Sequence, residues 1–271
     1  MKGSGPQRLL EIRGPVVEQC VAAGEARLDW SLAAERSVRQ PPTRKRVQVI
    51  TANFIHRTFR IKCGQSVGTG FAVDVDGRQY LVTAKHVVEN FAPPAVPLEV
   101  FGNQTWSIVP TRLVGHGGPD IDVSVLAPAA PISPPGLPVV VSSDGCAYGQ
   151  DVFFLGFPYG VMSGVIFGQS GHPMPLVKKA VLSCFAGPVY LLDGHNNPGF
   201  SGGPVVFGRD GALPNAIAGV VSGYRSAPEP VLLNQTDTGL IYRSNTGIIV
   251  TYKIETALEL MHANPVGAVV S

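Results

Sequence analysis

A proline-rich segment near the middle of the chain divides it into two sets of short apolar runs. Residues 127–138 have the sequence Ala-Pro-Ala-Ala-Pro-Ile-Ser-Pro-Pro-Gly-Leu-Pro. Because proline has no backbone N–H, such a segment cannot continue a regular β-ladder. We therefore expect a connector here, with a separate set of about six short strands on either side of it.

Turn-forming residues occur throughout both halves. Glycine (32) and proline (24) together make up about a fifth of the 271 residues and follow no repeat period, which is typical of short strands joined by many turns. The sequence therefore predicts an all-β fold of two packed six-stranded antiparallel β-barrels. The first barrel and the connector occupy residues 45–138, and the second barrel with a C-terminal helix occupies residues 139–271.

Local patterns predict particular elements. Asp76-Gly77 lies between two apolar runs and predicts a hairpin, because a type I′ turn has positive φ at both central residues. Phe54–Ile61 is β-rich, and we expect a strand there. Further strands are expected at Ile217–Ser222 and Gly247–Val250. Ile254–His262 carries its apolar side chains on one helical face and predicts the closing helix.

Residues 1–44 differ from the rest of the chain and are expected to form an N-terminal helical arm. The stretch from Val16 to Arg39 is rich in Ala, Glu and Arg, and its apolar residues recur at loosely helical spacing. This pattern predicts a helix, and Gln40-Pro41-Pro42 would end it.

Charge and cysteine content argue against several classes of function. The net charge of +2 is too small to indicate nucleic-acid or anionic-membrane partners, and no run approaches the about 18 apolar residues of a membrane span. No pair among Cys20, Cys63, Cys146 and Cys184 has CxxC spacing, so no metal or other cofactor is expected. Two disulfides and four free thiols both remain open. In the absence of a secretory signal, a cytoplasmic protein with reduced thiols is the default expectation.

One segment, Asn196-Asn197-Pro198-Gly199-Phe200-Ser201-Gly202-Gly203-Pro204, has the composition of an acyl-transfer loop. Glycines around Ser201 permit a tight turn that exposes the hydroxyl and directs backbone N–H groups into one small space. Nucleophilic attack on a carbonyl needs both an exposed hydroxyl and donors for the oxyanion that forms. The pattern is short, and a Gly/Pro surface loop is the alternative interpretation. A base and an orienting acid must therefore come from elsewhere in the chain.

His86 is the candidate base among the six histidines, because it follows an apolar strand where a short helix, Lys85–Glu89, is expected. The candidate acid is Asp122, which begins the apolar run Asp122-Val123-Ser124-Val125-Leu126; a carboxylate at such a place is costly unless it is paired. Asp120 is the rival, since alternation places it on the same face.

Four motifs occur in a fixed order: Thr83-Ala84-Lys85-His86-Val87-Val88, Asp122-Val123-Ser124-Val125-Leu126, Gly156-Phe157-Pro158-Tyr159-Gly160 and Asn197-Pro198-Gly199-Phe200-Ser201-Gly202-Gly203-Pro204. Together they resemble the trypsin-like (chymotrypsin-fold) serine endopeptidases, especially the bacterial HtrA-like branch, over about residues 45–255. The resemblance implies a hydrolase that cleaves protein or peptide substrates through an acyl-enzyme intermediate.

The resemblance also implies roles for single residues. His86 would be the general base, Asp122 its orienting acid and Ser201 the nucleophile. The backbone N–H groups of Gly199 and Ser201 would form the oxyanion hole. Asp122 is preferred to Asp120, because Asp122 fits the family pattern of an aspartate, any residue, a small residue and two apolar residues.

Departures from the family pattern carry further expectations. Phe200 stands where trypsin-like zymogens have an aspartate that captures a new N-terminus, so we expect no activation of that kind. No PDZ domain is expected after residue 262. The substrate pocket would be formed by His195 together with Val221, Ser222 and Gly223, and His195 replaces the aspartate that would select Arg or Lys. A surface position for His195 remains open, as does the oligomeric state.

Two other functions fit parts of the pattern. Gly199–Gly203 also matches the nucleophile elbow of α/β-hydrolases, for which Asp237 and His262 could complete an esterase triad and His116-Gly117-Gly118 the oxyanion loop. The β-branched residues after Pro204 argue against the helix that this elbow requires. The other alternative is a catalytically inactive binding module with a protease fold.

Overall fold

The computed structural model describes residues 50–90, 95–134, 136–161, 172–209 and 215–270. These residues all belong to one compact unit, Val47–Ser271. The predicted helix Val16–Arg39 lies outside the described residues.

The first barrel contains six antiparallel strands in the spatial order β3-β2-β1-β4-β5-β6, and pairing of β3 with β6 closes it. Their bounds are β1 Thr58–Cys63, β2 Ser66–Val75, β3 Arg78–Thr83, β4 Ala95–Gly102, β5 Thr105–His116 and β6 Ser124–Pro128. The β2–β3 turn has φ values of 49° at Asp76 and 70° at Gly77, which confirms the predicted hairpin. A short strand near the chain end, β14 (Ala268–Val269), pairs with β3 on this barrel.

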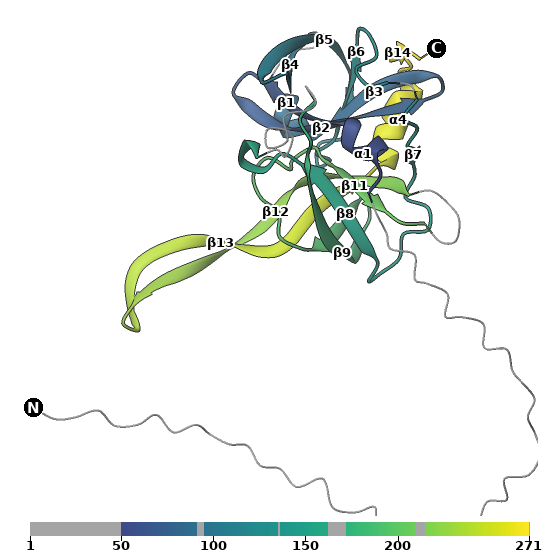
Figure 1. Cartoon of the computed structure of the whole chain (residues 1–271). Helices are drawn as coiled ribbons and strands as arrows, with labels where there is room; N and C mark the ends of the chain where they lie inside the picture. The colour runs from purple at the N-terminus through teal and green to yellow at the C-terminus, as the bar shows by residue number, and fades with distance from the viewer. Residues whose placement is uncertain (1–49, 91–94, 135, 162–171, 210–214, 271) are drawn as a thin grey trace, which may run out of the picture. The chain divides into compact units, whose positions relative to one another are not determined.

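The second barrel also closes, in the order β11-β8-β9-β10-β13-β12, through the pairing of β11 with β12. Its strands are β8 Asp151–Gly156, β9 Leu176–Ala186, β10 Val189–Asp193, β11 Pro204–Phe207, β12 Ala216–Leu233 and β13 Thr236–Lys253, and β7 (Val140–Val141) pairs with β12 in parallel. The two closed barrels confirm the predicted fold class. The distal half of the β12–β13 hairpin extends away from the barrel (Figure 1).

Short helical segments connect or follow the strands. They are α1 Ala52–His56, α2 Lys85–Val88, the 3₁₀ turn η1 Pro158–Gly160 and α4 Glu255–Ala263. The helices predicted after Ala84 and near the C-terminus are confirmed, as α2 and α4. No helix in the described ranges is long and apolar enough to cross a bilayer.

The predicted strand Phe54–Ile61 is wrong in its first half. Residues up to His56 belong to α1, and β1 begins only at Thr58. Phe54 is buried between the barrels, and the Thr58 hydroxyl donates to its carbonyl oxygen over 2.7 Å. Burial of one aromatic side chain and this local hydrogen bond override a weak strand propensity.

Three apolar clusters form the core. One fills the first barrel and another fills the second. The third lies at the seam, where Val82 and Val125 of the first barrel meet Leu155 and Val220 of the second. Helix α4 completes this seam with Ile254, Ala257 and Met261. A shared core fixes the positions of loops from the two barrels relative to each other.

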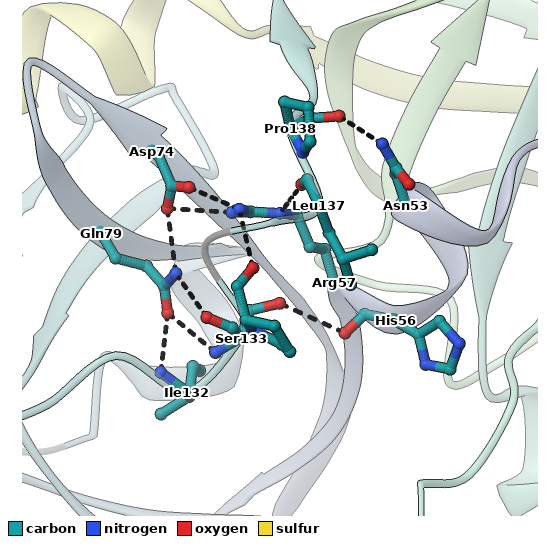
Figure 2. A network of polar contacts seen from close by, with 10 residues as sticks. Asn53, His56, Arg57, Asp74, Gln79, Ile132, Ser133, Leu137 and Pro138 are labelled. Atoms are coloured by element: carbon teal, nitrogen blue, oxygen red, sulfur yellow. Dashed lines mark hydrogen bonds and ion pairs between the residues drawn. The ribbon is translucent and has the colours of Figure 1, made fainter. Parts of the chain in front are cut away.

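The connector between the barrels is held by polar groups of the first barrel (Figure 2). The Gln79 amide oxygen accepts from the backbone N–H groups of Ile132 and Ser133 at 2.7 and 2.9 Å. Arg57, whose side chain is 1% exposed, pairs with Asp74 and donates to a connector carbonyl, Leu137 O. Because the prolines supply no N–H groups for a β-ladder, the side chains of Gln79 and Arg57 hold the connector in place of ladder hydrogen bonds.

Candidate active site

The loop that carries Ser201 depends on glycine at two positions. Gly199 has φ of +106°, and a Cβ there would lie 2.4 Å from the carbonyl oxygen of Phe157. Gly202 has φ of +84°, and a Cβ there would lie 2.1 Å from Thr69 O and 2.8 Å from Ala84 N. The loop is therefore pressed against the strand end that leads to His86, and only glycine allows that approach.

Hydrogen bonds to the loop's carbonyl groups orient its peptide planes. Pro198 O accepts from the N–H of Tyr159 at 3.0 Å, and Phe200 O accepts from the N–H of Gly203 at 2.8 Å. In a trans peptide the N–H points opposite to the C=O. The N–H groups of Gly199 and Ser201 are thus turned away from these contacts, and neither has a hydrogen-bond partner in the described part of the chain.

Thr69 of β2 connects this loop to the first barrel. Its backbone N–H donates to Ser201 O at 2.8 Å, and its hydroxyl donates to Gly199 O at 2.7 Å. The same hydroxyl accepts from the N–H of Phe157 at 3.3 Å. The sequence interpretation missed Thr69; the available signal was its position between two strand glycines, Gly68 and Gly70, where another backbone can approach closely.

His86 and Asp122 form a close pair at the edge of the first barrel. The ring Nδ1 of His86 lies 2.7 Å from Asp122 Oδ2, and the backbone N–H of His86 donates to Oδ1 at 2.9 Å. Asp120, the rival carboxylate, is exposed, and its backbone carbonyl accepts from Tyr252. Lys85 donates to the carbonyl oxygens of Gly118 and Pro119 at 3.3 and 3.5 Å. Lys85 thereby ties α2 to the segment that leads to Asp122.

The pair has shifted proton affinities. The hydrogen bond to Asp122 raises the pKa of His86 above 6.5, against partial burial, which lowers it. Burial alone raises the pKa of Asp122, but hydrogen bonds from His86 and Ser222 outweigh it and bring that pKa to about 2. Asp122 is therefore ionised at neutral pH. Its carboxylate accepts a hydrogen bond from the Nδ1–H group of a neutral His86, which leaves Nε2 as the basic nitrogen.

Ser222 links the acid to the serine. Its hydroxyl donates to Asp122 Oδ2 at 2.6 Å, and its carbonyl oxygen accepts from the Ser201 hydroxyl at 2.9 Å. Within the described residues, no hydrogen bond joins Ser201 to His86. The structure thus brings the three predicted side chains into one hydrogen-bonded neighbourhood through Ser222, with the serine hydroxyl directed toward a carbonyl.

The predicted pocket residues lie on two segments beside this loop. Val221 exchanges two backbone hydrogen bonds with Gly202 and Gly203, at 2.7 and 2.9 Å, which fixes the start of the Val221–Gly223 stretch beside Ser201. His195 is exposed. Lys178 donates to its backbone carbonyl and, at 3.0 Å, to Asn197 Oδ1.

The esterase alternative is wrong. Ser201 leads into a strand, β11, where an α/β-hydrolase requires a helix. Asp237 accepts from the N–H of Gly239 near the tip of the β12–β13 hairpin, and His262 lies 3.5 Å from Asp76. Neither residue contacts Ser201. Phe200, by contrast, is fully buried against Phe154 in the second barrel.

No group of His, Cys, Asp or Glu within the described ranges could hold a metal ion. The three cysteines that the structure describes, Cys63, Cys146 and Cys184, are free. Burial raises the pKa of the Cys63 thiol to about 11 and that of Cys146 to about 12. These two thiols are therefore poor nucleophiles.

Comparison with known families identifies the class of protein. The model of the trypsin-like peptidase domain matches residues 68–213, which is more than half of the chain. The chain belongs to the trypsin-like peptidase family. No curated protein is significantly similar to it in sequence.

Solved structures share the fold. The active form of the Rv3671c protease from M. tuberculosis is 21% identical with a TM-score of 0.51, and the match covers 81% of this chain and 88% of that one. The serine endoprotease from Yersinia pestis is 18% identical with a TM-score of 0.50, covering 80% and 67%. The HtrA-type protease AlgW, as its S227A variant with a tripeptide, is 18% identical with a TM-score of 0.51, covering 78% and 61%.

Proposed function

We propose that this protein is a serine endopeptidase in which His86, Asp122 and Ser201 form the catalytic triad. The observation that carries the proposal is the 2.7 Å contact between His86 Nδ1 and Asp122 Oδ2, beside a serine loop with two unpaired backbone N–H groups. The expected substrate is a protein or peptide, because the chain belongs to a peptidase family.

In the proposed reaction, Ser201 Oγ attacks the carbonyl carbon of the scissile peptide bond while His86 Nε2 takes the hydroxyl proton. Asp122 keeps the His86 tautomer and stabilises the imidazolium that forms. The imidazolium then gives its proton to the leaving amine as the C–N bond breaks. Water then attacks the acyl-enzyme carbonyl while His86 accepts a water proton. The bond from the carbonyl carbon to Ser201 Oγ breaks, His86 returns the proton to Oγ, and the carboxylic acid product leaves.

The oxyanion of each tetrahedral intermediate would be held by the N–H groups of Gly199 and Ser201. The contacts from Tyr159 and Gly203 to the preceding carbonyl oxygens support this assignment, because they fix the direction of both N–H groups before substrate binds. A pre-oriented donor of this kind is worth about 3–4 kcal/mol of barrier.

One observation favours the competing function, a non-catalytic binding module. The Ser201 hydroxyl donates to Ser222 O, and no hydrogen bond joins it to His86 in the described part of the chain. A serine side chain changes its hydroxyl direction by moving between staggered rotamers. The contact to Ser222 therefore describes a resting rotamer in the peptidase, and a permanent one in the binding module.

Reaction with a fluorophosphonate probe separates the two functions. A peptidase forms a covalent Oγ–P bond at Ser201 with release of fluoride, and Ser201→Ala abolishes the label. Ser183→Ala is the matched control, since Ser183 is exposed on β9 and its hydroxyl donates to the nearby Val181 O at 3.3 Å. Mass spectrometry of a peptide library would then identify the cleaved bonds. A folded protein that takes no label and cleaves no peptide contradicts the peptidase proposal.

The same library tests the proposed pocket of His195, Val221, Ser222 and Gly223. Because His195 has no negative charge to attract Arg or Lys, we expect cleavage sites without a basic preference before the scissile bond. Predominant cleavage after Arg or Lys would contradict this pocket assignment without affecting the triad.

A further inference from the structure

The distal part of the β12–β13 hairpin, Tyr224–Gly247, is an arm that the two barrels do not require. Pairing of β12 with β11 ends at Val220, and pairing of β13 with β10 ends at Ile248. Beyond these points the two strands pair with each other, and the hairpin extends away from the second barrel (Figure 1). A two-stranded ribbon has little stability of its own in water.

Large apolar side chains gather toward the tip of the arm. Each of five is more than half exposed: Leu232, Leu233, Leu240, Ile241 and Tyr242. Clustered exposure of this kind on a soluble protein marks an interaction surface. The two arginines and two carboxylates of the arm, Arg225, Arg243, Glu229 and Asp237, cancel to a net charge of zero. Nucleic acid and anionic lipid both attract basic surfaces, so neither fits this arm.

The outer edge of β12 cannot accept another strand. The backbone carbonyl oxygens of Arg225, Ala227 and Val231 accept from hydroxyl groups of β13. The backbone polar groups of these residues are therefore directed toward the partner strand. The backbone of the intervening Pro228 and Pro230 is therefore directed toward the outer edge, where each proline lacks the N–H that another strand would need. Prolines at these positions block edge-to-edge pairing.

The outer edge of β13 remains competent. Ile241 and Arg243 lie opposite Pro230 and Pro228, so they too face outward, and both carry an N–H and a C=O. An arm with two competent edges could add copies indefinitely, whereas an arm with one competent edge closes after a single pairing. This asymmetry favours a second copy of the same edge as the occupant, in a closed two-fold arrangement.

We propose that the arm is a homodimerisation element in which the β13 edge of one protomer pairs antiparallel with the β13 edge of a second copy. The resulting four-stranded ribbon places Leu240, Ile241 and Tyr242 beside the same residues of the second copy, as cross-strand pairs. The zero net charge lets two identical arms approach without repulsion.

Sedimentation velocity of the full chain across the micromolar range tests this proposal. The wild type is expected to sediment as a dimer. Ile241→Pro removes one outward N–H from β13, as Pro230 already does on β12, and is expected to yield a monomer. A shortened arm, with Ala227 joined to Ser244 by Asn-Gly, is also expected to be monomeric, because residues 227 and 244 are paired and suit a two-residue turn.

Ser226→Pro is the matched control, because residue 226 faces outward on the blocked edge and the dimer should persist. Thermal unfolding of each variant verifies that it is folded. A monomeric wild type, a species larger than a dimer, or a dimer that survives the shortened arm would each overturn the proposal. Fluorophosphonate labelling of Ser201 is measured separately, so loss of the dimer and loss of the proposed peptidase activity remain distinct results.

Discussion

Thr69 offers a sharp test of how the serine loop is held, because it belongs to the first barrel while its partners belong to the second. The side chain is fully buried. Its hydroxyl donates to Gly199 O over 2.7 Å and accepts from the N–H of Phe157 over 3.3 Å. Thr69→Val keeps the shape of the side chain and removes only this hydroxyl. Thr69→Ser keeps the hydroxyl and removes the methyl group.

Thr69→Val leaves two backbone groups, Gly199 O and the N–H of Phe157, without the hydroxyl that they bond, and the loss of stability follows from these two groups. A buried donor or acceptor left unpaired costs about 1–3 kcal/mol. The contact to Phe157 is long, so its share lies at the lower end, and we expect Thr69→Val to lower the free energy of unfolding by about 2–4 kcal/mol. For Thr69→Ser we expect a loss of about 1 kcal/mol, the value of one buried methyl group. Urea denaturation measures both differences.

The effect on catalysis is separable from the effect on stability. The Thr69 hydroxyl fixes the peptide plane that follows Gly199, next to the plane that carries the proposed oxyanion donor. If that donor is misdirected, kcat falls by about 10²–10³-fold. KM is expected to stay within about threefold, because the donor acts on the transition state. Rates are normalised to the fraction of sites titrated by the fluorophosphonate, so that unfolded protein does not count.

Two results would refute this reasoning. The first is a Thr69→Val enzyme whose kcat per titrated site equals that of the wild type. The second is a Thr69→Ser enzyme whose kcat falls as far as that of Thr69→Val, since this would assign the effect to the methyl group.

Three further predictions concern other contacts. Because His86 must be neutral to act as the base, kcat/KM should rise with pH and level off above a pKa higher than 6.5. Asp122→Asn removes the main cause of the raised pKa of His86, so the pH–rate profile should shift to lower pH, with a plateau at least about 10²-fold lower. An unshifted profile would contradict the pairing of His86 with Asp122. Arg57→Met leaves the Asp74 carboxylate without its ionic partner and should lower the free energy of unfolding, measured by urea denaturation, by about 3 kcal/mol. For the exposed Arg112→Met we expect a loss of at most about 0.5 kcal/mol. Equal losses for the two variants would contradict the anchoring role of Arg57. Gly199→Ala would place a Cβ 2.4 Å from a carbonyl oxygen at φ of +106°, so turnover and fluorophosphonate labelling should both fall by at least about 10²-fold; normal labelling would show that the loop tolerates a side chain.

The local parts of the fold were predictable because the signals lie within a few residues. Asp76-Gly77 specifies its turn through backbone conformation alone, and the prolines of 127–138 rule out a ladder wherever they occur. The α4 helix was visible in its apolar spacing. The α1 helix around Phe54 could not be predicted, because it depends on packing of Phe54 between two barrels that are distant in sequence.

The residue types of the candidate site could be selected from the sequence, but the contacts that connect them could not. His86, Asp122 and Ser201 could be selected by motif and order. The part played by Ser222, whose hydroxyl and carbonyl join the acid to the serine, depends on a strand of one barrel passing the edge of the other. No spacing rule in the sequence expresses that contact, and the same holds for the three hydrogen bonds that join Thr69 to Ser201, Gly199 and Phe157.

The β12–β13 arm was missed for a related reason. The predicted strands Ile217–Ser222 and Gly247–Val250 stop close to where the barrel stops, and no strand was predicted between them, although Pro228 and Pro230 lie in β12. In the structure both prolines occupy an edge that pairs with nothing in the described residues. Proline excludes a residue from the interior of a sheet, and it does not exclude a strand whose outer side stays open.

The path of the chain after β13 limits how the two barrels can move relative to each other. The polypeptide leaves the second barrel, packs α4 into the seam and finishes as β14 on the first barrel, with Asn264 donating to Val114 O on the way. A covalent strap of this kind couples the two halves, so hinge-like opening between them would first require its detachment. Any change of conformation at the proposed catalytic centre should therefore take place in surface loops, while the two halves keep their mutual orientation.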